Sequence, residues 1–193
     1  SGIWSKKRLK GSELSGKKLG LVGFGRISKG VANISHHLGM DIHYFDPFID
    51  ENGQFTKHNS IEDLFDECTH ISIHCNLTPE TEGLVNLDLI KRMPTFDKEG
   101  VECGNHIVNC ARGGIINEKD ALIALNDGYL TSLALDVFEI EPATGQQLLQ
   151  HEKFNGSPHI AASTKEAQNR IGIEMVELID EFFRGEKPST ALN

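Results

Sequence analysis

The sequence is short of basic residues. Its 193 residues include 19 Lys and Arg against 28 Asp and Glu, which gives a formal net charge of −9. Binding to nucleic acids or to anionic membrane surfaces relies on a surplus of Lys and Arg that neutralises phosphates. The one basic cluster, residues 6–8, has no amphipathic repeat and is typical of a solvated loop. Neither a nucleic acid nor a membrane surface is therefore expected as a partner.

Long apolar runs and cysteine frameworks are also missing. No apolar run approaches the roughly 20 residues that a membrane span needs, and residues 1–4 lack the apolar segment of a signal peptide. The spacing of the four cysteines fits no disulfide framework. They are Cys68, Cys75, Cys103 and Cys110. We therefore expect reduced thiols in a cytoplasmic protein.

The nine histidines show no spacing that suits a metal ion. His70 and His74 share one face of a predicted strand, but four residues along a strand span about 13 Å, which is too far for one ion. His36 and His37 are neighbours on a predicted helix and point apart. No metal site is expected.

What is present is a regular alternation of short apolar runs and helical patterns. Strands are predicted at 19–24, 42–45, 70–75, 106–110 and 132–138, with a short extended piece at 158–160. Helices are predicted at 26–38, 61–66, 81–91, 118–126 and 163–184. This alternation predicts an α/β fold with a doubly wound, mainly parallel sheet covered on both faces. The length fits a single domain, residues 1–193.

Helix ends and loops complete this prediction. Gly39 is expected to end the first helix, and Asn117 to cap the fourth. The last helix opens with a predicted capping box of Ser163 and Glu166. Its apolar stripe is expected to belong to the core; the stripe consists of Ile171, Met175, Leu178 and Phe182. The polar stretch 94–105 is predicted to be a surface loop.

The turn Gly23-Phe24-Gly25 links the first strand to the first helix. Gly23 permits the tight turn, and Gly25 lets the backbone approach a pyrophosphate at the positive end of the helix dipole. Asp46 ends the second strand 21 residues after Gly25, where a carboxylate can accept hydrogen bonds from the adenosine ribose. Alternatively, Asp46 and Pro47 only end a strand in a turn. A carboxylate there also repels a 2′-phosphate, so the predicted cofactor is NAD rather than NADP.

These residues belong to longer stretches that resemble a known family. The stretches are 16–20, 25–27, 108–114, 134–138 and 158–168. Over nearly its whole length the chain resembles the cofactor domain of the D-isomer-specific 2-hydroxyacid dehydrogenases, a Rossmann-type NAD-binding domain. The run from Ser163 to Gln168 favours the phosphoglycerate dehydrogenase branch. The resemblance implies oxidation of 3-phosphoglycerate to 3-phosphohydroxypyruvate, as in serine biosynthesis.

The resemblance also implies roles for individual residues. Arg112 matches the arginine that binds the substrate carboxylate, His159 the acid–base histidine, and Glu141 the carboxylate paired with it. A histidine suits proton transfer near neutral pH, and a neighbouring carboxylate raises its pKa and fixes its tautomer. A guanidinium can clamp an anionic substrate through two hydrogen bonds.

The same resemblance assigns the remaining cofactor contacts. Asp136 matches the residue that holds the nicotinamide carboxamide, and Arg26 and Ile27 match the pyrophosphate contacts. The other implied residues of the cofactor cleft are Cys75, Cys110, Ala111, Arg112, His159, Ala161 and Ala162.

Three positions depart from the family pattern. Ser28 stands at the third glycine of the turn, Asn76 stands where relatives usually carry proline, and 93–105 is longer than the usual link. The substrate-domain segments that flank this domain in the family are absent from the sequence. We therefore expect an excised domain that binds NAD(H) but catalyses poorly or not at all. Relatives dimerise through this domain, so a homodimer is expected.

Two alternatives stay open. One is another 2-hydroxyacid dehydrogenase, of the glyoxylate, hydroxypyruvate or lactate type. The other is an NAD-sensing binding module like the corepressors of the same superfamily, which keep the Arg, Glu and His set. The run 163–168 favours the enzyme, and the substrate remains undecided between these classes.

Overall fold

The computed structural model describes residues 11–50 and 53–186. The chain divides into two compact units, the first ending at Pro158 and the second beginning at His159. Each unit is described by itself below. None of the helices within the described ranges is long and apolar enough to cross a membrane.

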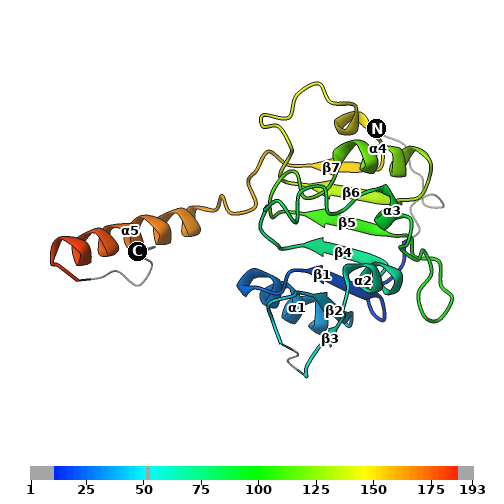
Figure 1. Cartoon of the computed structure of the whole chain (residues 1–193), viewed down its shortest axis with the longest axis horizontal. Helices are drawn as coiled ribbons and strands as arrows, with labels where there is room; N and C mark the ends of the chain where they lie inside the picture. Colours follow the sequence, from blue (N-terminus) through cyan, green and yellow to red (C-terminus); the bar gives the residue numbers. More distant parts are fainter. Residues whose placement is uncertain (1–10, 51–52, 187–193) are drawn as a thin grey trace. The chain divides into compact units, whose positions relative to one another are not determined.

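The first unit is built on one sheet of parallel strands in the order β3-β2-β1-β4-β5-β6-β7 (Figure 1). The strands are β1 (Lys18–Val22), β2 (Asp41–Phe45), β3 (Thr56–Lys57), β4 (His70–Ile73), β5 (His106–Asn109), β6 (Ser132–Leu135) and β7 (Phe154–Gly156). The helices are α1 (Arg26–His37), α2 (Ile61–Glu67), α3 (Leu87–Ile90), α4 (Glu118–Asn126) and the 3₁₀ helix η2 (Gln147–Gln150). The predicted α/β fold with a doubly wound parallel sheet is confirmed.

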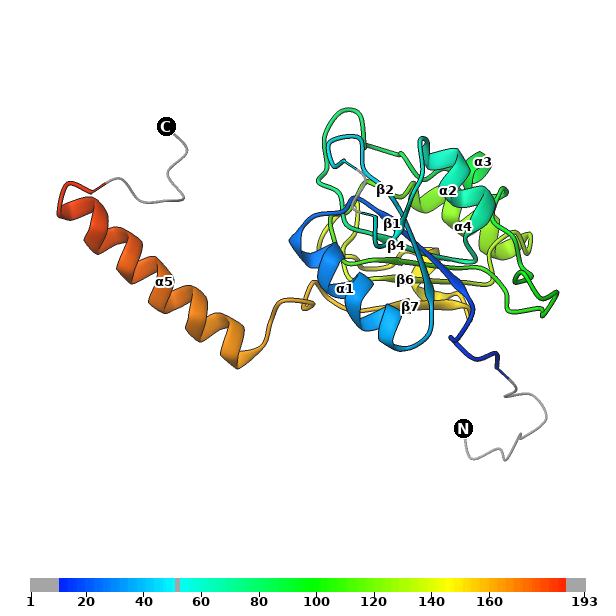
Figure 2. The same ribbon diagram turned by 90° about the horizontal axis from the view of Figure 1, so that it is seen from below.

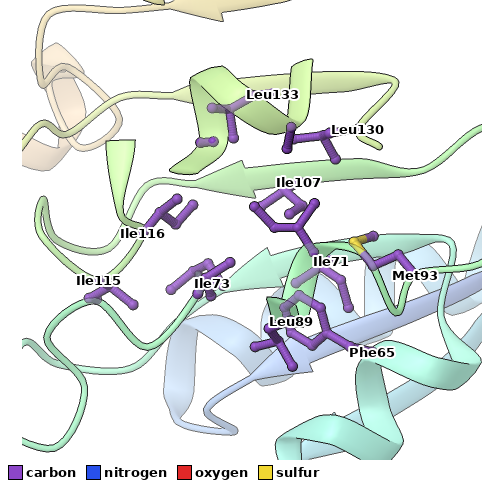
Figure 3. Close-up of a cluster of buried hydrophobic side chains, with 14 of the residues drawn as sticks. Phe65, Ile71, Ile73, Leu89, Met93, Ile107, Ile115, Ile116, Leu130 and Leu133 are labelled. Atoms are coloured by element: carbon purple, nitrogen blue, oxygen red, sulfur yellow. The ribbon is translucent and has the colours of Figure 1, made fainter. Parts of the chain in front are cut away.

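Two layers of helix flank the sheet, and each covers its own apolar cluster. Figure 2 shows α1 on one face and α2, α3 and α4 on the other. Under the three helices, side chains of α2, α3 and the strands β4 to β6 pack together, with Phe65, Ile71, Ile107 and Leu133 at most 1% exposed (Figure 3). Under α1, Phe24 stacks on Tyr44 with ring centroids 4.0 Å apart. Burial of this apolar surface is the main force that holds the unit together.

The two faces of the sheet differ in burial along β4 and β5. Along β4, the residues Ile71 and Ile73 are buried, whereas His70 and Ser72 on the opposite face are only half-buried. The same alternation runs along β5, where Val108 is exposed. Within the first unit, the helix on this face is α1, which contacts β1 and β2.

Several predicted elements differ in their bounds. The helix expected at 81–91 is wrong for its first half, because only Leu87–Ile90 is helical. Val85 instead forms a parallel bridge with Ile116. The extended piece expected at 158–160 is also wrong, because the seventh strand lies earlier, at Phe154–Gly156.

The second unit contains one helix, α5 (Lys165–Phe183). Its N-cap is Thr164, whose Oγ1 accepts the Ala167 amide at 3.1 Å, so the predicted capping box of Ser163 and Glu166 is wrong. No residue of α5 is buried. Among the described residues of this unit, α5 has no second helix or strand to pack against, so the core role of its stripe stays a prediction. Ile171, Met175 and Phe182 are all more than half exposed, and Leu178 is only partly buried.

Four histidines, one buried and three partly buried, make the stability of the first unit sensitive to acid. Burial lowers the pKa of His43, His58 and His74 below its ordinary value, and it lowers the pKa of His70 to about 4, with a smaller contribution from His106. The folded chain thus binds fewer protons than the unfolded chain at pH values below about 6.5. The resulting stability is complete above that pH and is lost as the pH falls.

We expect the free energy of unfolding to fall by about 2 kcal/mol between pH 7 and pH 5 from His70 alone. Urea titrations at several pH values measure this slope. In His70→Asn the slope should be shallower, and in the control His36→Asn, an exposed position on α1, it should stay as in the parent chain. An unchanged slope in His70→Asn would contradict the assignment.

A second stability prediction concerns Ser28, on the buried side of α1. The Ser28 residue is 1% exposed, and its Oγ has no hydrogen-bond partner among the residues that the structure describes. A buried hydroxyl without a partner destabilises the fold. Ser28→Ala should therefore raise the free energy of unfolding by about 1 kcal/mol. Urea unfolding measures the free energy of unfolding of both variants. Ser35→Ala on the same helix serves as the control, because it shows the gain from helix propensity alone. A loss of stability in Ser28→Ala would refute the prediction.

Candidate functional site

The predicted site residues of the first unit follow the carboxyl ends of its parallel strands. Ligands of such sheets bind at this edge, near the point where the strand order reverses. Here the reversal lies between β1 and β4, because β1 pairs with β2 on one side and with β4 on the other. The glycine turn follows β1, at the reversal itself.

Gly23 holds this turn in a conformation that few other residues adopt. Its φ is +89°, and a Cβ at this position would lie 2.9 Å from the Cys75 amide nitrogen, on the segment after β4. The Gly23 amide donates to the Phe45 carbonyl at 2.8 Å. Gly23 is therefore required by the fold, since a side chain would separate the segments that follow β1 and β4.

Asp46 is fixed by two backbone amides. Its Oδ2 accepts the Phe24 amide at 2.7 Å, and its Oδ1 accepts the Phe48 amide at 2.9 Å. The first bond ties Asp46 to the glycine turn, and the second forms a local turn. Both sequence interpretations of Asp46 are thus compatible with its contacts, because each oxygen keeps a lone pair for a further donor.

Gly25 differs from Gly23 in having open space. Its φ is −78°, which any residue adopts, and a Cβ at this position would have nothing within 4 Å. Gly25 is the N-cap of α1 without a side-chain cap, so the amides of the first turn remain available. The following residues Arg26 and Ile27 are exposed, Ile27 by 78%. We call the open space at Gly25 and the free amides of the first turn of α1 the cradle. The cradle fits the pyrophosphate of a dinucleotide, which needs close approach to backbone amides.

The segments after β4 and β5 supply the next predicted residues. Cys75 is half-buried, and burial raises the pKa of its thiol. Cys110 is exposed, and Ala111 is half-buried. None of the four cysteines forms a disulfide in this structure.

Arg112 is exposed on a loop that Asn109 organises. Asn109 is 1% exposed; its Nδ2 donates to the Arg112 carbonyl at 2.9 Å, and its Oδ1 accepts the Ala111 amide at 2.9 Å. The Arg112 Nη1 donates to the Ala111 carbonyl at 2.6 Å. No role for Asn109 was predicted from the sequence, although a polar residue at the end of an apolar strand is a signal for one.

The segment after β6 carries Asp136 and Glu141. Asp136 is 2% exposed, and its Oδ1 accepts the Ser157 hydroxyl at 2.6 Å. Glu141 is exposed, and its Oε1 accepts the Phe138 amide at 3.1 Å.

This segment touches the Arg112 loop through Gly113. A Cβ on Gly113 would lie only 1.8 Å from the Phe138 carbonyl oxygen. The structure therefore brings the loops of Arg112 and Glu141 into backbone contact. Gly113 lies within one of the family stretches, but this contact was not predicted from the sequence.

The remaining predicted residues belong to the second unit. His159 is its first residue and has a φ of 54°, a left-handed conformation that is uncommon for a side chain of this size. His159, Ala161 and Ala162 are exposed. The first unit by itself thus assembles Asp46, Arg112, Asp136 and Glu141 along one edge of the sheet.

The departures from the family pattern lie in different places. Asn76 is exposed, and its carbonyl accepts the Thr81 hydroxyl at 2.6 Å. The long segment 93–105 is anchored to the sheet by a buried ion pair, Lys17 Nζ to Asp97 Oδ2 at 2.6 Å, with side chains 6% and 5% exposed. It is a loop, as predicted, but an anchored one. Within the described ranges, no three metal-ligating side chains cluster.

Comparison with known proteins gives consistent matches. Residues 1–161 match the family described as "D-isomer specific 2-hydroxyacid dehydrogenase, NAD binding domain". A D-3-phosphoglycerate dehydrogenase of Bacillus subtilis (strain 168) is 39% identical over 98% of this chain and 35% of its own length. A hydroxypyruvate reductase of Thermotoga maritima is 42% identical over 92% of this chain and 56% of its own length. The chain thus spans about a third to a half of these relatives.

Solved structures agree in fold. A "putative D-isomer specific 2-hydroxyacid dehydrogenase, NAD-binding" from Polaromonas sp. JS6 66 superimposes with a TM-score of 0.89 at 25% identity, covering 100% of this chain and 59% of that one. The TT0316 protein of Thermus thermophilus gives a TM-score of 0.88 at 29% identity, covering 99% of this chain and 58% of that one.

Proposed function

Because the chain belongs to the D-isomer-specific 2-hydroxyacid dehydrogenases and carries their NAD-binding domain, we propose that it takes part in NAD-dependent oxidation of a D-2-hydroxy acid. The observation that carries the proposal is the cradle at the glycine turn. Gly25 leaves open space at the start of α1, and Asp46 is tied to the same turn through the Phe24 amide. Gly23, Gly25, Arg26 and Ile27 would hold the pyrophosphate, and Asp46 the adenosine ribose.

The remaining cofactor contacts would line the rest of the same edge. Asp136 would bind the nicotinamide carboxamide. The cleft around it would be lined by Cys75, Cys110, Ala111, Ala161 and Ala162. Bound NAD supplies the acceptor for the hydrogen and its electron pair.

The chain's own residues supply substrate binding and proton transfer in this proposal. The exposed guanidinium of Arg112 clamps the substrate carboxylate through two hydrogen bonds. His159 takes the proton of the 2-hydroxyl group, and Glu141 favours the protonated imidazole that results. The Phe138 amide, which donates to Glu141 Oε1 at 3.1 Å, holds this carboxylate on the segment after β6.

3-Phosphoglycerate is the proposed substrate, and serine biosynthesis the proposed context. The relative from Bacillus subtilis and the run 163–168 support this choice. The relative from Thermotoga maritima supports hydroxypyruvate as a second candidate. Measuring oxidation of 3-phosphoglycerate by NAD beside reduction of hydroxypyruvate by NADH, in the whole protein, separates the two. The proposal also includes a single cofactor-binding domain over 1–193, a homodimer and a cytoplasmic location.

The cofactor site is tested by calorimetric titration of the chain with NADH and with NADPH. We expect NADH to bind at least about 10-fold more tightly, because the Asp46 carboxylate repels a 2′-phosphate. Asp46→Asn should reduce this preference. Asp50→Asn removes the same charge from an exposed position four residues away and should leave the preference unchanged. Equal affinity for both cofactors in the parent chain would contradict the assignment of Asp46.

A further inference from the structure

The segments that carry Arg112 and Glu141 are joined by a second contact beyond Gly113. Glu118, the first residue of α4, donates its amide to Glu139 Oε1 at 2.9 Å. Glu139 donates its amide to Glu118 Oε1 at 2.6 Å. Each glutamate therefore accepts the backbone amide of the other, which closes a ring between α4 and the segment after β6. We call this pair the glutamate clasp.

The chemistry of the clasp is unusual because both acceptors are acidic. Two carboxylates side by side repel each other, and burial together with the charge of Glu139 raises the pKa of Glu118. The arrangement is tolerated because Glu139 faces the amino end of α4, where free amides and the helix dipole stabilise a negative charge. The clasp also fixes the backbone next to Glu139.

The peptide between Phe138 and Glu139 is held on two sides. Its carbonyl packs against Gly113, and its amide donates to Glu118. The preceding amide, on Phe138, donates to Glu141 Oε1 at 3.1 Å. The backbone that holds the Glu141 carboxylate is thus fixed on one side by the Arg112 loop and on the other by Glu118.

We propose that Glu118 is a positioning residue for Glu141: through the clasp it fixes the Phe138 amide that orients the Glu141 carboxylate. This inference rests on the proposed function, in which Glu141 acts on His159. Glu118 touches neither substrate nor cofactor in this assignment. Its effect passes through Glu139 and the backbone, and both oxygens of the clasp are needed only as hydrogen-bond acceptors.

Amide NMR of the full 193-residue chain tests the proposal directly. In the parent chain the Phe138 amide proton should shift as Glu141 titrates, because it donates to that carboxylate. Glu118→Ala should reduce this shift by at least about half. It should also speed hydrogen exchange of the Phe138 amide by about 10-fold, which corresponds to a decrease of about 1.4 kcal/mol in the free energy of local opening. Glu118→Gln keeps an oxygen acceptor at the same reach and should restore both values.

Asn117→Ala is the matched control. It removes the side-chain cap of α4, in which Asn117 Oδ1 accepts the Lys119 and Asp120 amides, without removing an atom of the clasp. It should lower stability by about 1 kcal/mol and leave the Phe138 titration intact. The proposal is overturned if Glu118→Ala leaves the Phe138 amide unchanged, or if Asn117→Ala disturbs it equally.

Turnover of the same variants, made in the whole protein, separates this inference from the proposed function. If Glu141→Gln abolishes turnover while Glu118→Ala affects neither the Phe138 amide nor the rate, the positioning role fails and the function stands. If Glu141→Gln leaves turnover unchanged while Glu118→Ala disturbs the amide, the clasp stands and the assigned role of Glu141 fails.

Discussion

Gly113→Ala is expected to destabilise the chain by about 3 kcal/mol or more. The added methyl group would lie 1.8 Å from the Phe138 carbonyl oxygen and 2.2 Å from its carbon, so one of two backbone segments must move. Both segments are tied to neighbouring elements, the first through Asn109 and the second through Glu118. Neither can shift without breaking these hydrogen bonds, and the free energy of unfolding should fall accordingly.

Gly114→Ala provides the control, since Gly114 is the next residue on the same loop. Its φ is +82°, but a Cβ there would meet only the Leu77 side chain, at 3.6 Å. The expected loss is about 1 kcal/mol from the left-handed backbone alone. Urea unfolding measures the free energy of unfolding of both variants, so it compares the steric clash in Gly113→Ala with the backbone strain in Gly114→Ala. Equal losses in the two variants would show that the contact between Gly113 and Phe138 relaxes freely.

The local parts of the fold could be predicted because their causes are local. The glycine turn, α1 and β2 follow one another within residues 18–45, and each is marked by its own apolar period. The helix over 61–66 and the cap at Asn117 were predicted for the same reason, and both are present. Residues 81–86 were mistaken for a helix because their pairing partners lie far along the chain, at Gly114 and Ile115. No local pattern records such a partner.

The amphipathic patterns were harder to interpret than the element types. In α1, the apolar residues Ile27 and Ile34 have the expected helical spacing, yet they are 78% and 67% exposed. The buried side of α1 consists of Ser28 and Ala32, whose small side chains allow close approach to the sheet. An apolar period predicts a helix, but it does not identify which element the helix packs against.

The contacts of the candidate site likewise include local ones, which the sequence predicts, and long-range ones, which it does not. The contact between Asp46 and the glycine turn could be predicted from spacing along the chain, because the turn, the helix and the second strand are consecutive. The contact of Gly113 with Phe138 and the glutamate clasp both join residues more than 20 positions apart, and both depend on the order of β5 and β6 in the sheet. Such contacts become visible only once the fold is known.

Gly25→Ala is expected to weaken NADH binding about 10- to 100-fold while leaving stability nearly unchanged. The φ of −78° at Gly25 suits alanine, and the added Cβ would meet nothing within 4 Å; the fold itself therefore gives no reason for a glycine there. A pyrophosphate bound against the first turn of α1 would need that space.

Gly30→Ala, on the same helix, is the control. Its added Cβ would also have nothing within 4 Å, and it should raise the free energy of unfolding by about 0.5–1 kcal/mol without changing the affinity for NADH. Calorimetric titration with thermal unfolding of both variants measures the two effects separately. Full NADH affinity in Gly25→Ala would mean that the dinucleotide does not approach this turn, whereas lost affinity with an unchanged melting temperature would place its pyrophosphate at the start of α1.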